Sequence, residues 1–168
     1  MFQQGGRIKE LTNILDIHAT ILDLAKVKNT SHCDGKSIIP LVNKTSRNWE
    51  NEIFIQISES ELARSLRTSK WKYCISDLTS NGNDKPSSDN YTETSLYDLD
   101  ADPYELNNLI GINAYDEILN DLRKKMKRKI KKIENISIKI NKGQNIINPG
   151  QLGLKPDSFH RLKKNFNK

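Results

Sequence analysis

The sequence predicts an α+β fold, a small antiparallel sheet of about four strands packed by a C-terminal helix. Two patterns carry this prediction. Short runs with period-two alternation follow one another between residues 52 and 99, and a long amphipathic helical pattern begins at Asn113. A further helical pattern, over residues 10–27, precedes the sheet. Successive short strands favour antiparallel pairing, because tight turns join such strands whereas parallel strands need long crossovers.

The helical pattern before the sheet has two interpretations. Its apolar side chains recur at helical spacing, which indicates one helix over residues 10–27. Alternatively, a short strand ends at Ile14, and Asp16 caps a helix over residues 17–27. We favour the second interpretation, because aspartate suits the start of a helix better than its interior. The polar residues 28–51 then form a connection to the sheet.

Four strands are predicted, over residues 52–57, 62–67, 70–76 and 94–99. In the first of these strands, three isoleucines point to one side and a phenylalanine to the other. Thr68 and Ser69 separate the second strand from the third at hairpin distance. Residues 79–93 are rich in Gly, Pro, Asn and Ser, which predicts a long loop before the fourth strand.

The C-terminal helix is predicted to begin at Asn113, with acidic residues in its first turn and basic residues in its second half. Both placements are favourable with the helix dipole. Its apolar stripe consists of Tyr115, Ile118, Leu119, Leu122, Met126, Ile130 and Ile133. Beyond Ile140 the sequence mixes Gly, Pro, Asn and Lys without a period, which predicts a loose tail.

The formal charge of +6 hides an uneven distribution. Residues 1–120 hold 12 Lys/Arg against 18 Asp/Glu, a balance of −6, whereas residues 121–168 hold 15 against 3, a balance of +12. An acidic body with a basic extension argues against a nucleic-acid partner for the chain as a whole. Only the basic extension keeps binding to a polyanion open as a function.

The sequence does not indicate a membrane-spanning protein or a secreted one. No stretch approaches the roughly 20 apolar residues that span a membrane. The first ten residues lack the apolar segment of a secretory signal, so the compartment is left open with the cytoplasm as the default. Cys33 and Cys74 are expected to be reduced, small apolar side chains, and a single disulfide between them is the alternative.

Four motifs follow one another along the chain: DIHATILDLA at residues 16–25, DGKSIIPL at 34–41, RTSKWKY at 67–73 and LYDLDADPYELNNL at 96–109. Together they resemble the C-terminal region of bacterial sulfatases of the alkaline-phosphatase-like superfamily. The family has D-x-x-P-T, D-G-x-S-h-x-P-L, R-T-x-x-W-K-Y and L-Y-D-L-x-x-D-P-x-E-x-x-N-L in the same order. One departure is Ala19, which stands where the family has proline, and alanine is also a good helix former.

The resemblance implies sulfuric-ester hydrolysis by a complete enzyme, with a formylglycine made from the Cys or Ser of a C/S-x-P-x-R motif and with Ca²⁺ bound in the N-terminal domain. In this motif the Cys or Ser stands two positions before a proline. The chain has five prolines, and the residues at that position are Ile38, Asp84, Ala101, Ile147 and Leu154. None of these is Cys or Ser, so the motif does not occur here. We therefore expect an arylsulfatase-like C-terminal fragment with no catalytic residue, metal ligand or cofactor of its own. Its expected partner is the N-terminal catalytic half.

The resemblance also divides the chain. Residues 1–50 correspond to the end of the large α/β domain and a linker, so their helix would belong to the edge of that missing domain. Residues 51–138 correspond to the C-terminal subdomain. Residues 139–168 have no counterpart and are expected to form a basic, flexible tail.

The candidate substrate-binding residues are Ser58, Glu59, Arg64 and Arg67. In a complete enzyme they would lie at the rim of the substrate pocket, where arginine suits an anionic sulfated ligand through paired hydrogen bonds. The alternative is a cross-strand ion pair that joins Glu59 or Glu61 to one of the two arginines on a solvated face.

Other clusters are given structural interpretations. Trp71 and Tyr73 alternate with lysines, a pattern that can bind single-stranded nucleic acid but that also describes a strand packing its aromatics. The acidic residues of 98–105 lack the glycine of an EF-hand loop and indicate a turn. Two functions follow: the C-terminal part of a sulfatase, or a non-enzymatic polyanion-binding module that uses the basic helix and tail.

Overall fold

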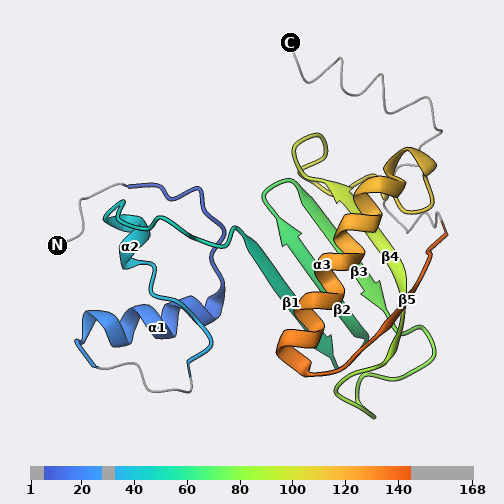
Figure 1. Cartoon of the computed structure of the whole chain (residues 1–168), viewed down its shortest axis with the longest axis horizontal. Coiled ribbons are helices and arrows are strands. Elements are labelled where there is room, and N and C mark those ends of the chain that lie inside the picture. Colours follow the sequence, from blue (N-terminus) through green and yellow to red (C-terminus); the bar gives the residue numbers. More distant parts are fainter. Residues whose placement is uncertain (1–5, 28–32, 145–168) are drawn as a thin grey trace. The chain divides into compact units, whose positions relative to one another are not determined.

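A computed structural model describes residues 6–27 and 33–144 and confirms the α+β class (Figure 1). Its elements are α1 (Ile14–Leu24), α2 (Ile39–Val42), β1 (Glu52–Ser58), β2 (Leu62–Thr68), β3 (Trp71–Ser76), β4 (Asn90–Asp98), a 3₁₀ turn (Asn113–Tyr115), α3 (Asp116–Glu134) and β5 (Lys139–Asn141). The chain divides into two compact units between Ile53 and Phe54, and each unit is described by itself. No helix within the described ranges has the length and apolar character needed to cross a membrane.

The first unit corrects the favoured interpretation of its helix. α1 begins at Ile14, with Asn13 as the N-cap and Asp16 at the third helical position. The Asp16 Oδ2 atom accepts a hydrogen bond of 2.7 Å from the backbone N–H of Asn13 and so completes a capping box. The predicted strand ending at Ile14 and the cap at Asp16 are therefore wrong, because Asn13 caps the helix three residues earlier.

The sheet has the order β1-β2-β3-β4-β5, one strand more than predicted. β2, β3 and β4 pair antiparallel, with a bulge between Cys74 and Ile75. β5 pairs parallel to β4, although its residues 139–141 were predicted to lie in the loose tail. A three-residue strand that pairs with a distant segment carries no local alternation by which it is recognised. The rest of the predicted tail, residues 145–168, lies outside the described residues.

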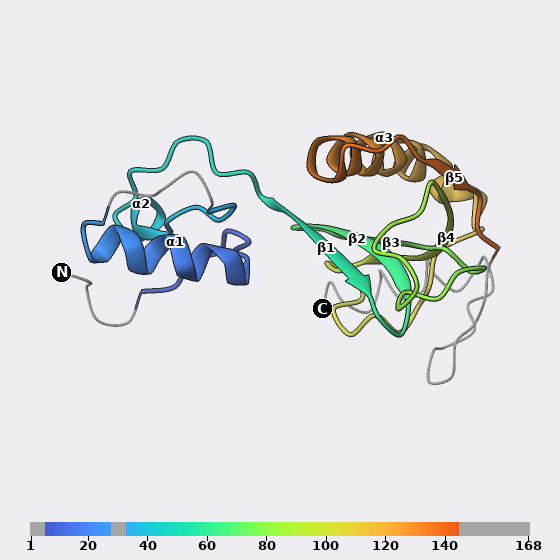
Figure 2. The ribbon, with the colours of Figure 1, turned by 90° about the horizontal axis from the view of Figure 1, so that it is seen from below.

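Helix α3 lies along one face of the sheet, as Figure 2 shows. The face beneath it presents Leu62, Arg64 and Leu66 from β2, because alternate residues of a strand point the same way. The core between helix and sheet consists of Leu62, Leu66, Tyr73, Ile75, Tyr91, Leu96, Leu109, Ile110, Tyr115, Leu119, Leu122, Met126 and Ile130. The opposite face of the sheet, which we call the open face, carries the side chains of the strand residues that alternate with the core residues.

Candidate functional site

Arg64 of β2 is buried beneath α3. Its side chain is fully buried, and Nε and Nη2 donate to the two carboxylate oxygens of Glu134 at 2.6 and 3.0 Å. This paired geometry is the strong form of an arginine–carboxylate bond. The predicted ion pair of Arg64 with Glu59 or Glu61 is therefore replaced by one with the last residue of α3.

The remaining donors of Arg64 bind backbone oxygens of three neighbouring segments. Nη1 donates to the carbonyls of Ile57 and Ala63 at 3.1 and 2.8 Å, and Nη2 donates to the carbonyl of Pro86 at 2.7 Å. One side chain thus joins the end of β1, the start of β2, the loop before β4 and the end of α3. Its hydrogen-bonding capacity is used inside the chain.

Ser58 belongs to the same cluster as Arg64. The Ser58 hydroxyl donates to the carbonyl of Pro86 at 2.7 Å and accepts a longer bond from Arg64 Nη1 at 3.4 Å. Glu59 is exposed at the turn that follows, where its backbone N–H donates to the carbonyl of Glu61. The structure therefore brings Ser58 together with Arg64, and leaves the Glu59 carboxylate in solvent.

Arg67 lies on the opposite face of β2 from Arg64, because the two residues are three positions apart in one strand. It stands directly across from Lys72 of β3. Among the described residues, the Arg67 guanidinium has no hydrogen-bond or ion-pair partner. Of the two predicted arginines, only Arg67 has a guanidinium without a partner in the part of the chain that the structure describes.

The surroundings of Arg67 carry an excess of positive charge. Lys72 Nζ is 2.5 Å from Glu105 Oε2 and 5.8 Å from the ring centre of Tyr97, its neighbour in β4. Like charges that face each other across strands destabilise a sheet, and one carboxylate neutralises only one of these two cations. The open face therefore presents an unbalanced guanidinium, which suits an anionic group such as a sulfate.

Two acidic residues of the turn after β4, Asp98 and Asp102, hold the turn together, which agrees with the structural interpretation. Asp98 Oδ1 accepts from the backbone N–H groups of Asp100 and Ala101, and Asp102 Oδ2 accepts from the backbone and side chain of Asn107. Asp98 and Asp102 are both buried. Within residues 6–27 and 33–144, no three His, Cys, Asp or Glu side chains gather in a group that could hold a metal ion.

A second buried network, around Glu93, was not predicted. Arg123 Nε and Nη2 donate to the Glu93 carboxylate at 2.5 and 3.1 Å, and the Tyr73 hydroxyl donates at 2.9 Å. The backbone N–H of Gly143, just beyond β5, donates to the same carboxylate at 3.2 Å. Burial, and then the Glu93 charge, raises the pKa of Tyr73 far above its ordinary range. Glu93 was assigned to a polar loop, although β4 already begins at Asn90.

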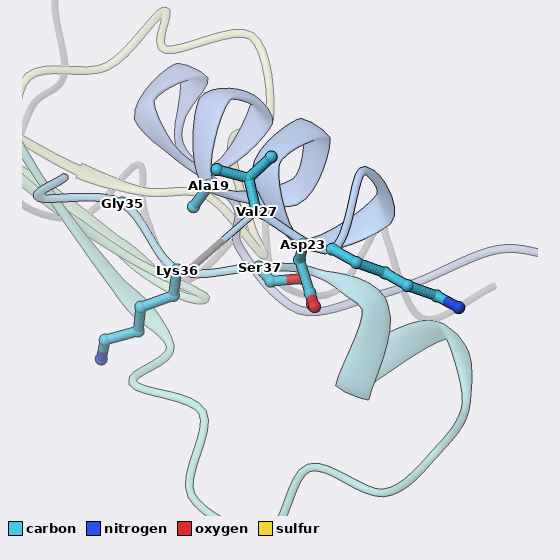
Figure 3. Close-up of a pocket in the computed structure, with 7 residues that line it drawn as sticks. Ala19, Asp23, Val27, Gly35, Lys36 and Ser37 are labelled. Atoms are coloured by element: carbon cyan, nitrogen blue, oxygen red, sulfur yellow. The ribbon is translucent and has the colours of Figure 1, made fainter. Parts of the chain in front are cut away.

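The first two motifs build a turn against α1. Asp16 Oδ1 accepts from the backbone N–H of Lys36 at 2.8 Å, and Thr20 Oγ1 accepts from that of Ile38 at 3.0 Å. Gly35 lies so close to the backbone of Leu15 that a Cβ atom would clash with it. Figure 3 shows residues that line a pocket beside this turn, which are Ala19, Asp23, Lys26, Val27, Gly35, Lys36 and Ser37.

Helix α1 turns a polar face inward and an apolar stripe outward. Its buried residues are Asp16, Ala19 and Thr20, which face the turn of the second motif. Its exposed apolar residues are Ile14, Leu15, Ile17, Ile21 and Leu24, each more than half exposed. Ile14, Ile17, Ile21 and Leu24 follow helical spacing and form one continuous stripe, the α1 stripe. The α1 stripe is thus an exposed apolar surface of the first unit.

The family model of the C-terminal domain of N-sulphoglucosamine sulphohydrolase matches residues 1–132. The chain is 29% identical over 114 residues to arylsulfatase K of Rattus norvegicus, covering 61% of this chain and 18% of the relative. It is 28% identical over 123 residues to an arylsulfatase of Clostridium perfringens, covering 73% and 23%. The chain thus spans about a fifth of the length of the curated relatives that it matches.

Two solved structures share the fold. BT4656, solved in complex with its substrate D-glucosamine-2-N,6-O-disulfate, is 23% identical with a TM-score of 0.58, over 71% of this chain and 24% of that one. BT1596, described as a 2-O GAG sulfatase, is 20% identical with a TM-score of 0.54, over 73% and 26%.

Proposed function

Since the chain belongs to the family of N-sulphoglucosamine sulphohydrolase C-terminal domains, we propose that it serves as the C-terminal part of a sulfatase, beside an N-terminal catalytic half. The nucleophile would belong to the catalytic half, because the C/S-x-P-x-R motif is absent from this chain. The present chain would contribute a docking surface and part of the pocket rim. The family name indicates a sulfated sugar as the substrate class.

The observation that carries this proposal is the α1 stripe. Three of its members, Ile14, Ile17 and Ile21, are 79%, 55% and 58% exposed, whereas the buried face of the same helix includes an aspartate and a threonine. A helix that serves only its own chain places its apolar face against that chain. In α1 the apolar residues face outward and polar residues face inward, which supports the existence of a partner that covers the α1 stripe. The partner that we propose is the catalytic half of a sulfatase.

The chain alone is expected to hydrolyse no sulfate ester, with or without added Ca²⁺, because its partner supplies the nucleophile. The test begins with the DNA upstream of Met1, which should contain a frame that encodes C-x-P-S-R. Co-expression of that product with the chain is expected to give a stable complex and sulfatase turnover. Hydrolysis by the chain alone, or the absence of such a frame, would contradict the proposal.

The docking surface is tested by substitution in the same complex. Ile17→Asp combined with Ile21→Asp is expected to prevent co-purification, because two charges would be buried in the interface. Lys44→Asp, an exposed position of the first unit, is the control and should leave the complex intact. Circular dichroism of the free chain shows whether each variant is folded. A folded double variant that still co-purifies would place the docking surface elsewhere.

Arg67 is the residue that we propose to contact the sulfated substrate. Arg67→Ala in the assembled enzyme should lower kcat/KM about 10- to 100-fold, the loss expected for a hydrogen-bonded charge pair of about 1.5–3 kcal/mol. Arg67→Lys should recover only part of that loss, because lysine cannot form paired bonds to one anion. Lys70→Ala, at the neighbouring turn, is the control. An unchanged kcat/KM in Arg67→Ala would exclude this role.

For Arg64, by contrast, we propose no contact with the substrate; its role is to hold the neighbouring backbone in place. Its bonds to Ile57 and Ser58 hold the end of β1, and no donor of its guanidinium faces the open side of the sheet. Glu59 is exposed at the turn after β1. Its assignment to the rim of the substrate pocket rests on the sequence alone.

A further inference from the structure

The outer surface of α3 is densely basic. The exposed cations of this helix are Lys124, Lys127, Arg128, Lys131 and Lys132, which we call the basic face. Opposite them, Leu119, Leu122, Met126 and Ile130 are buried in the core. Because these buried side chains pack against the sheet, the basic face on the other side of the helix points away from the sheet. At 1.5 Å per residue it extends over about 12 Å.

The segment that carries the basic face contains no acidic residue of its own. Between Leu122 and Ile133 the sequence holds eight Lys or Arg and no Asp or Glu. The residues three and four positions before and after Arg128 are all lysines: Lys124, Lys125, Lys131 and Lys132. Pairs of like charge at these spacings destabilise a helix. Lys124 has an ion pair at 3.7 Å with Asp121, one turn before the basic face begins.

The helix dipole explains only part of this charge. Cations are favourable near a helix C-terminus, but the effect falls off within the last turn, which here holds Lys131 and Lys132. Lys124, Lys127 and Arg128 lie earlier in the helix. Their clustering is instead complementary to a ligand that carries several negative charges at once.

We infer that the basic face of α3 binds a sulfated polysaccharide. This inference rests on the proposed function, because the sulfated sugar class comes from the family assignment. A polymeric substrate carries sulfates beyond the one that is hydrolysed, and these would bind the basic face. Single-stranded nucleic acid is the less suitable polyanion, because α3 contains no aromatic residue on which bases stack.

The test measures binding of fluorescently labelled heparin to the full chain by anisotropy at two salt concentrations. The wild-type chain should bind heparin in a salt-dependent manner, and desulfated heparin should bind at least tenfold more weakly. Lys127→Gln, Arg128→Gln and Lys131→Gln together should weaken binding at least tenfold. This assay uses the chain without a catalytic half. Its result therefore tests heparin binding separately from the proposed sulfatase activity.

Two matched variants, each removing two lysines and one arginine, control for total charge. One carries Lys9→Gln, Lys44→Gln and Arg47→Gln, in the first unit, and should bind heparin within twofold of wild type. The other carries Arg161→Gln, Lys163→Gln and Lys164→Gln, and should retain most of the affinity. Loss of binding only in this last variant would overturn the inference. So would duplex DNA or anionic lipid vesicles that bind the basic face more tightly than heparin.

Discussion

Replacing Arg64 by methionine is expected to lower the free energy of unfolding by about 3–5 kcal/mol, the range for removing one partner of a buried ion pair. Glu134 would lose both of its charge-assisted bonds, and its carboxylate is nearly buried, with a side chain 11% exposed. The carbonyls of Ile57, Ala63 and Pro86 would lose a donor at the same time. Methionine fills similar volume, so the loss reports on the polar network rather than on a cavity.

Urea unfolding followed by Trp71 fluorescence measures this loss, in a Trp49→Phe background so that the signal reports on the sheet. The matched control is Arg67→Met, on the same strand but on the open face. Because Arg67 has no partner among the described residues, its replacement should change the stability by less than about 0.5 kcal/mol. Equal losses in the two variants would show that the Arg64 network does not hold the sheet and α3 together.

Replacing Glu93 by alanine is the second large expected effect, again about 3–5 kcal/mol. Arg123 and the Tyr73 hydroxyl would lose their common acceptor in a site where Glu93 is only 3% exposed. The backbone of Gly143 would lose its bond as well, which should release the end of β5. Glu93→Gln should lose less, because the amide keeps one acceptor oxygen.

Urea unfolding gives the stability of these variants, and amide hydrogen exchange of Gly143 reports on the end of β5. Glu105→Ala is the control, because its ion pair with Lys72 is partly exposed and is expected to contribute about 1 kcal/mol or less. Glu93→Ala should also speed exchange at Gly143, whereas Glu105→Ala should not. Unchanged exchange at Gly143 in Glu93→Ala would show that this carboxylate does not anchor the end of β5.

The elements with a strong local pattern were predicted closely. The strands expected over residues 52–57, 62–67 and 70–76 agree with β1, β2 and β3 to within one residue at either end. Alternation with period two is a property of neighbouring residues, so it is visible without knowing the partner strand. The start of α1 was wrong, because Asn13 and Asp16 are both good residues for a helix start, and the choice depends on which backbone groups they reach.

The candidate site was predicted only in part. Arg64 and Arg67 look alike in the sequence, and a carboxylate 70 positions away distinguishes them. The Glu93 network likewise joins β4, α3 and Gly143, segments that no local pattern connects. A buried charge is recognised by its partners, and these are distant in the sequence.

The sequence by itself determined the fold class, the family resemblance and the absence of the formylglycine motif, because each depends on the order of residues along one chain. The tertiary structure decided which arginine is buried and which faces the open side of the sheet. It also showed that α1 turns its apolar stripe outward, and that five cations of α3 share one exposed face. These properties depend on which surfaces the fold covers, and burial is a property of the packed chain.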